Sequence, residues 1–135
     1  MERLIKVMDK YLKDAVADID KKKVLALTIS KQWFDMIVAG KKNEEYREIK
    51  PYWASRLVNQ QAESGDVLFD EFGSYCRVIG KLEYKPYTYV RFFNGYAKNR
   101  PWIDKKIESI SIGKPKKGLC PDKWLDTEFF IIKFK

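Results

Sequence analysis

Residues 40–47, which read GKKNEEYR, hold side chains suited to binding a polar ligand. If the segment after Lys42 is extended, its side chains alternate between two faces, so Glu45 and Arg47 share one face and Tyr46 points to the other. Lys42 stands at the entrance to this strand and can join them. The group then offers a point charge, a carboxylate acceptor and a bidentate guanidinium fork. This combination predicts recognition of a polar ligand more than hydrolysis.

Composition removes several kinds of catalytic and metal site. The chain has no histidine and two cysteines, Cys76 and Cys120. A zinc site or a disulfide framework therefore lacks ligands or partners, and we interpret both cysteines as reduced, buried thiols. Without histidine, the Ser-His and Cys-His nucleophile pairs are also excluded, and Lys, Tyr, Asp or Glu must do any acid-base work. We predict no metal, no cofactor and, on balance, no enzyme.

Positive charge is concentrated in one part of the chain. Residues 91–118 contain eight basic and two acidic side chains, and so hold +6 of the net charge of +8. Aromatic residues are interleaved with these bases, a mixture that attracts a polyanion with flat bases. We predict phosphate contacts from Arg91, Lys98, Arg100, Lys105 and Lys106, with Tyr96 or Phe93 stacking on a base. The alternative is a solvated loop whose aromatic side chains pack into the domain.

Length and hydropathy favour one soluble domain of 135 residues, with no apolar run long enough to span a bilayer. The N-terminus lacks the apolar block of a secretory signal, which predicts a cytoplasmic protein.

An apolar stripe over residues 2–18 predicts an amphipathic helix, with 1–23 forming this helix and a linker. The polar face of that helix mixes acids with bases, so a protein partner is favoured over a membrane.

The elements that must position the motif can be read from its flanks. Residues 24–29 predict a buried strand, and Ser30 is a plausible N-cap for a helix that ends at Gly40. The strand bearing the motif follows, and a short helix begins after Pro51. Further strands are predicted over 67–72, 77–84, 87–90, 106–112 and 128–134, with an exposed loop over 113–121. The pattern favours an α+β domain built round a small, strongly curved sheet or barrel.

The motif and its flanks resemble the ASCH family, whose GxKxxExR signature is filled here by Gly40, Lys42, Glu45 and Arg47. The resemblance covers roughly residues 24–135. It implies a PUA-like β-barrel of five to six mostly antiparallel strands with flanking helices, to which this chain adds its N-terminal helix. It also implies a cleft near the motif that binds RNA or a modified nucleotide.

One branch of that family consists of small amidohydrolases that act on acylated cytidine. The lysine of its motif corresponds to Lys42, while Glu45 occupies the position of its threonine. The family's third residue, a glutamate, has no counterpart that we can locate between Val90 and Lys105, where Asp104 is the only acid. We therefore favour a binding module, with an amidohydrolase using Lys42 and Glu45 as the alternative.

Other residues near the motif have both a structural and a functional interpretation. A salt-bridge network is the structural alternative for the motif's charged residues, although exposed pairs contribute only about 0.2–1 kcal/mol. Trp33 is more typical of a core residue than of a stacking platform, and Tyr46 of a core or rim residue. Trp53 and Arg56 can fold back over the cleft from the short helix, although Arg56 is more typical of a solvated surface charge. A protein-protein adaptor that uses the helix over 2–18 is the third function considered.

Overall fold

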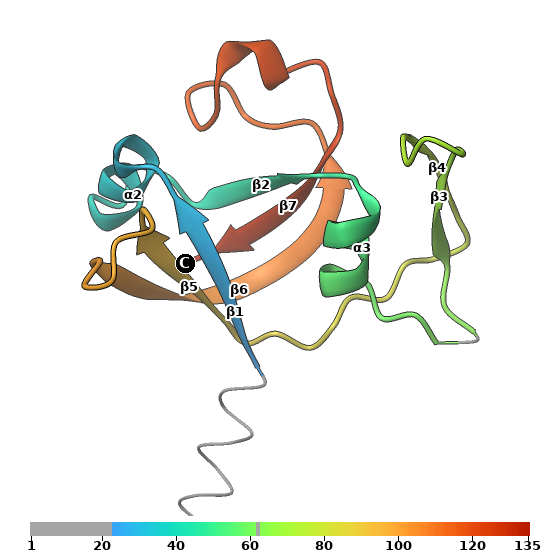
Figure 1. Cartoon of the computed structure of the whole chain (residues 1–135), viewed down its shortest axis with the longest axis horizontal. Helices are drawn as coiled ribbons and strands as arrows, with labels where there is room; N and C mark the ends of the chain where they lie inside the picture. Colours follow the sequence, from blue (N-terminus) through green and yellow to red (C-terminus); the bar gives the residue numbers. More distant parts are fainter. Residues whose placement is uncertain (1–22, 62) are drawn as a thin grey trace, which may run out of the picture.

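The computed structural model describes residues 23–61 and 63–135 (Figure 1). The predicted N-terminal helix over 2–18, its linker to residue 22 and the protein partner assigned to that helix therefore lie outside the described residues. Within the described part of the chain, no helix is long and apolar enough to cross a membrane.

The motif lies on a strand-helix-strand unit, as predicted. Strand β1 (Val24–Ile29) leads into helix α2 (Lys31–Val38), and β2 (Glu44–Glu48) follows. Ser30 is the N-cap in an extended conformation, although its side chain makes no capping hydrogen bond. After the helix, Gly40 adopts a φ of +73°, a left-handed conformation that favours glycine and turns the chain toward β2.

The remaining elements complete a domain rich in strands. They are α3 (Pro51–Leu57), β3 (Asp66–Phe69), β4 (Tyr75–Ile79), β5 (Tyr89–Asn94), β6 (Trp102–Gly113), the 3-10 helix η1 (Asp122–Trp124) and β7 (Phe129–Phe134). Each predicted strand has a counterpart, but the bounds differ most for β4, β5 and β6. Much of the basic segment at 91–118 is therefore paired strand, because β5 and β6 form an antiparallel hairpin.

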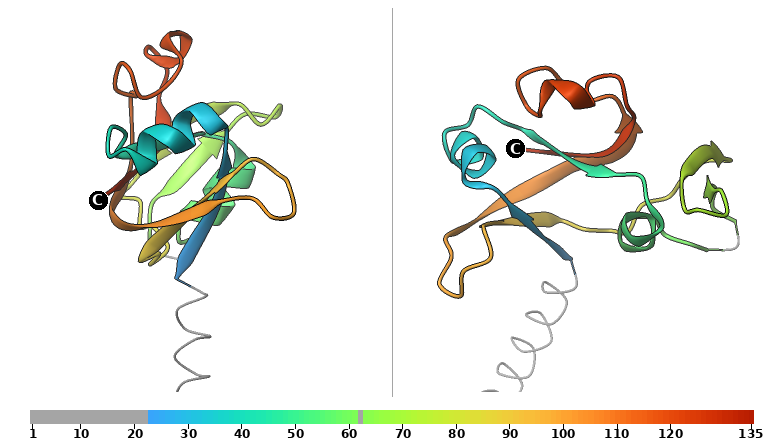
Figure 2. Two further views of the ribbon diagram at one scale, coloured as in Figure 1. Left: turned by 90° about the vertical axis from the view of Figure 1, so that its left-hand side faces the viewer. Right: turned by 45° about the horizontal axis from the view of Figure 1, so that its top comes forward.

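Five strands form one sheet in the order β1-β5-β6-β7-β2, and β3 and β4 form a separate antiparallel pair. The β1–β5 pairing is parallel, and the other pairings in the large sheet are antiparallel. The 12-residue β6 bends through the domain and joins its two halves, while the β3–β4 hairpin lies to one side (Figures 1 and 2). The α+β class is confirmed, but the predicted barrel is wrong for the described residues: β1 and β2 stay unpaired edges, so the sheet is open.

Alternating strand residues build the main core on one side of this sheet. Leu25 and Leu27 of β1 pack with Val90 and Phe92 of β5, and helices α2 and α3 add further apolar side chains. A second, smaller cluster forms on the other side of β2 and β7. It contains Tyr46, Cys120 and Phe129, with Leu119, Trp124, Leu125 and Ile131 packed against it.

Two features of the structure depart from the sequence prediction, and the second cluster explains the first of them. Residues 113–121 were predicted to be an exposed loop, yet Pro115 and Cys120 are buried because this segment covers β2. The prediction that both cysteines are buried is also wrong, since Cys76 is exposed on β4.

Candidate functional site

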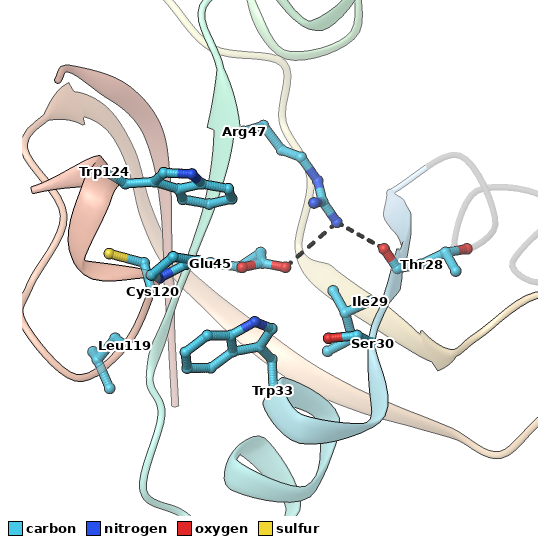
Figure 3. A pocket seen from close by; sticks show the side chains of 10 residues that line it. Thr28, Ile29, Ser30, Trp33, Glu45, Arg47, Leu119, Cys120 and Trp124 are labelled. Atoms are coloured by element: carbon cyan, nitrogen blue, oxygen red, sulfur yellow. Dashed lines mark hydrogen bonds and ion pairs between the residues drawn. The ribbon is translucent and has the colours of Figure 1, made fainter.

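A cavity of about 240 Å³ opens beside the motif, at the seam where the two edge strands, β1 and β2, do not pair with each other. We call it the seam cavity. Its walls come from the end of β1, the start of α2, the motif strand β2 and the segment that enters η1 (Figure 3). The lining residues are Thr28, Ile29, Ser30, Trp33, Glu45, Arg47, Leu119, Cys120, Pro121 and Trp124.

Glu45 and Arg47 both line this cavity, which confirms that they share one face of the motif strand. Their register partners on β7 are Ile132 and Phe130, both with no exposed surface in the main core. The two charged side chains therefore lie on the core-facing side of the sheet. Removing a carboxylate and a guanidinium from water costs several kcal/mol per ion, which good pairing only partly offsets.

The Glu45 carboxylate keeps accepting capacity toward the cavity. Its Oε1 accepts a hydrogen bond of 3.0 Å from the Tyr46 N–H. Ion pairs connect Oε1 to Lys42 Nζ at 3.6 Å and Oε2 to Arg47 Nη2 at 3.4 Å. An ionised carboxylate offers about four lone-pair sites, so the contacts from the described residues leave acceptor positions for a ligand.

Arg47 ties the two edges of the sheet together. Its Nη2 donates to the Thr28 carbonyl oxygen at 3.1 Å, across the seam from β2 to β1 (Figure 3). The guanidinium carbon lies 5.2 Å from the centre of the Trp53 ring, so one face of the fork rests on an aromatic side chain. Nε is buried without a hydrogen-bond partner among the described residues. A guanidinium carries five N–H donors, and this one therefore retains donors at the edge of the cavity.

Lys42 is not a lining residue, because its side chain is buried behind the cavity and only 2% of the residue is exposed. Its ammonium donates to the Leu119 carbonyl oxygen and lies 5.1 Å from the Trp33 ring centre and 4.9 Å from that of Tyr46. Burial lowers the pKa of Lys42, while the neighbouring Glu45 carboxylate opposes part of that shift. Lys42 thus links the motif to the segment that enters η1.

Two tryptophans form opposite walls of the seam cavity. Trp33 comes from the first turn of α2 and Trp124 from η1, and in Figure 3 their rings lie on either side of the Glu45 carboxylate. Each ring also contacts a residue that does not line the cavity. Trp124 stacks on Phe129 at 5.0 Å between ring centres, and the Lys42 ammonium lies over Trp33. These contacts hold both rings in place.

Tyr46 points away from the cavity into the second cluster, in line with the predicted alternation. Its hydroxyl donates to Glu44 Oε2 at 2.8 Å and accepts from the Lys116 N–H at 3.1 Å. Burial raises the pKa of Tyr46, so the phenol stays protonated at neutral pH. Tyr46 therefore fixes the segment that carries Trp124, without contacting the cavity itself.

The basic residues of the β5–β6 hairpin lie apart from the seam cavity. Arg91 forms a bidentate pair with Asp104, at 2.8 and 2.9 Å, and its guanidinium carbon lies 4.2 Å from the Trp102 ring centre. These residues share the solvent-facing side of the sheet with Lys106, while Lys105 lines a hollow on the opposite side. Much of the charge of Arg91 is therefore balanced within the hairpin.

The hairpin loop forms a second, wider hollow of about 620 Å³. Tyr96 is 86% exposed there, and Lys98 lies nearby on the loop. Arg100 packs over the Phe93 ring at 4.1 Å and donates to the Gly95 carbonyl oxygen at 3.2 Å. This hollow shares no lining residue with the seam cavity.

A backbone contact places the start of the hairpin loop beside the seam cavity. The Gly95 N–H donates to the carbonyl oxygen of Ile29 at 2.9 Å, and Ile29 lines the cavity.

On α3, Trp53 contacts Arg47, whereas Arg56 lies over Tyr52 and Trp53 on the surface. Trp53 thus belongs to the surroundings of the site, and Arg56 does not reach its lining.

Sequence reasoning missed seven of the ten lining residues of the seam cavity, four of them within residues 119–124. Trp124, Cys120 and Leu119 are far from the motif in sequence, and no spacing rule connects them to it. Burial raises the pKa of the Cys120 thiol, with the Lys42 ammonium acting in the opposite direction. The available signal for Trp124 was an aromatic residue just after a loop rich in Gly, Pro and Lys, which is too common to assign a function.

The site offers two flat aromatic walls, a carboxylate acceptor and guanidinium donors, an arrangement suited to binding a planar polar ring. The described residues contain no group of three or more His, Cys, Asp or Glu side chains that could hold a metal ion. No family model matches the chain, and no curated protein or solved structure matches it either.

Proposed function

We propose that the chain is an RNA- or nucleotide-binding domain that takes a single nucleobase into the seam cavity. The observation that carries this proposal is the position of Glu45 and Arg47. Both lie on the core-facing side of β2 and line the seam cavity, at a place where apolar side chains are the stable choice. A polar ring that pairs with these groups accounts for charges in that position better than a salt bridge does.

Cavity size supports a base as the occupant. Pockets for small molecules usually measure about 300–1,000 Å³, and the seam cavity has about 240 Å³. A volume below that range suits one ring system, with the sugar and phosphate left outside. The start of the basic hairpin loop beside Ile29 gives the phosphates a positively charged neighbour.

The strand-helix-strand unit around GxKxxExR supports a further proposal, that this domain is PUA-like and of the ASCH type. In the amidohydrolase alternative, Lys42 acts as a general base. Its lowered pKa favours that role, but its ammonium lies outside the cavity lining and is held by Leu119 and Glu45. We therefore propose binding without turnover, and incubation with N4-acetylcytidine followed by product analysis separates the two functions.

The test of binding is a fluorescence anisotropy titration of a short single-stranded RNA of mixed sequence. Removing one stacking wall with Trp124→Ala is expected to weaken binding by roughly tenfold to a hundredfold, since a base-aromatic stack is worth about 1–3 kcal/mol. The matched control is Phe72→Ala, an exposed aromatic on the β3–β4 turn. Circular dichroism verifies that both variants are folded. Equal affinity for the two variants contradicts the proposal.

A further inference from the structure

The polar groups of the seam cavity specify more than a generic planar ring. Trp33 and Trp124 offer stacking faces that every base can use, so stacking on them does not discriminate among bases. Choice must come from Glu45 and Arg47, whose charged groups lie 3.4 Å apart at the cavity wall. A carboxylate accepts hydrogen bonds and a guanidinium donates them, so the fitting ring edge carries N–H donors next to an acceptor.

Each oxygen of the Glu45 carboxylate has two lone pairs, so the group can accept from two neighbouring donors of a ligand, one at each oxygen, in addition to the Tyr46 N–H. Only one hydrogen bond from the described residues occupies it, the one from the Tyr46 N–H. The ion pairs with Lys42 and Arg47 are longer and leave Oε2 without a hydrogen bond from the described residues. A carboxylate in its ionised form accepts hydrogen bonds at both oxygens.

We propose, resting on the proposed function, that the seam cavity selects a base of the guanine type. The pairing edge of guanine carries a carbonyl oxygen followed by two neighbouring N–H donors. The carbonyl oxygen matches the Arg47 fork, and the two N–H donors match the two oxygens of Glu45. Adenine and cytosine place one amino donor beside a ring nitrogen acceptor, and uracil flanks its single N–H with two carbonyls. Each of these brings an acceptor against the carboxylate, which leaves lone pairs facing lone pairs in a partly buried site.

The size of the preference follows from the number of hydrogen bonds. A hydrogen bond to a charged group that is lost without replacement reduces affinity by about tenfold or more. Guanine makes one more such bond to Glu45 than hypoxanthine, which lacks the 2-amino group. Guanine should therefore bind about tenfold tighter than hypoxanthine, with adenine, cytosine and uracil weaker still.

The experiment measures binding of GMP, IMP, AMP, CMP and UMP to the full chain by tryptophan fluorescence quenching at one salt concentration. All five carry the same phosphate, so phosphate attraction cancels from the comparison. The expected result is GMP about tenfold tighter than IMP, and IMP tighter than AMP. Equal affinity for GMP and IMP, or tighter binding of AMP, CMP or UMP than of GMP, overturns the guanine preference while leaving nucleotide binding intact.

Two variants assign the preference to the carboxylate. Glu45→Gln keeps the shape but replaces one acceptor oxygen by a donor, so the advantage of GMP over IMP should disappear. Glu48→Gln is the matched control, because Glu48 lies on the same strand but is exposed and paired with Lys50. An unchanged preference in folded Glu45→Gln overturns the assignment. If none of the five nucleotides binds the wild-type chain, the proposed function itself fails, and this preference with it.

Discussion

At the scale of single residues, Glu45 and Lys42 have different roles in the motif. The Glu45 carboxylate lines the seam cavity, whereas the Lys42 ammonium is buried behind it and donates to Leu119. Lys42 is therefore a positioning residue. Its ammonium forms an ion pair with the Glu45 carboxylate and donates to the backbone of the segment that enters η1. Breaking such a buried pair by removing one partner typically destabilises a protein by about 3–5 kcal/mol.

The first prediction concerns the pKa of Lys42. Titration of the lysine side chains by NMR should show a pKa for Lys42 below the ordinary value of a lysine, because burial disfavours the ammonium. In Glu45→Gln the pKa of Lys42 should fall further, since the carboxylate that raises it has gone. A Lys42 pKa that is unchanged or higher in this variant contradicts the account.

The sign of the linked stability effect follows from that shift. With a folded pKa below the unfolded value of about 10.4, the unfolded chain binds more protons between the two values. The contribution of Lys42 to the free energy of unfolding therefore rises with pH across that interval. It opposes folding most at pH values below both pKa values.

At the scale of elements, the segment between β6 and β7 completes a site that begins on β1, α2 and β2. Residues 114–128 bring Trp124 to the cavity, and the Tyr46 hydroxyl holds this segment through the Lys116 N–H. The seam itself exists because β1 pairs with β5 and β2 with β7, which leaves their other edges free.

The second prediction tests the attachment of this segment. Tyr46→Phe removes the hydroxyl that donates to Glu44 and accepts from Lys116, and leaves both partners in a partly closed region. Stability should fall by about 1–3 kcal/mol in chemical denaturation. Amide hydrogen exchange should become faster in residues 114–125. Tyr89→Phe, on the surface of β5, is the matched control and should change neither quantity by much; equal effects in both variants would rule out this role for Tyr46.

Much of this local structure could be predicted from the sequence, whereas the long-range assembly could not. The strand at 24–29, the helix that stops before Gly40 and the alternation of Glu45 with Tyr46 follow from local spacing. The parallel pairing of β1 with β5 joins residues 65 positions apart, such as Val24 and Tyr89. The hydrophobic spacing within a segment does not indicate which distant strand pairs with it. Trp124 escaped prediction for the same reason.

At the scale of the whole molecule, charge and recognition are separated. The seam cavity holds few free charges, while the positive excess lies largely on the β5–β6 hairpin and the loop after it. Within the hairpin, Arg91 is paired with Asp104, which leaves the exposed Lys98 and Lys106 as better candidates for phosphate contact. Affinity for RNA should therefore depend on salt through the hairpin and on base identity through the cavity.

The third prediction follows from this separation. The affinity of single-stranded RNA should fall as salt rises, with a logarithmic slope of about 0.7 per phosphate contact. The double variant Lys98→Ala/Lys106→Ala should lower that slope by about 1.4 and keep the preference among bases. Lys81→Ala, an exposed lysine next to β4, serves as the control. A slope that is the same in all three proteins contradicts a hairpin role.

The most direct measurement of the central claim is an RNA titration followed by the indole N–H signals of the four tryptophans in NMR spectra. A base that enters the seam cavity should shift the signals of Trp33 and Trp124 in a saturable way and by more than that of Trp102, which lies on the outer face of the hairpin. If RNA binds and the Trp102 signal moves while those of Trp33 and Trp124 stay in place, the seam cavity is not the base-binding site.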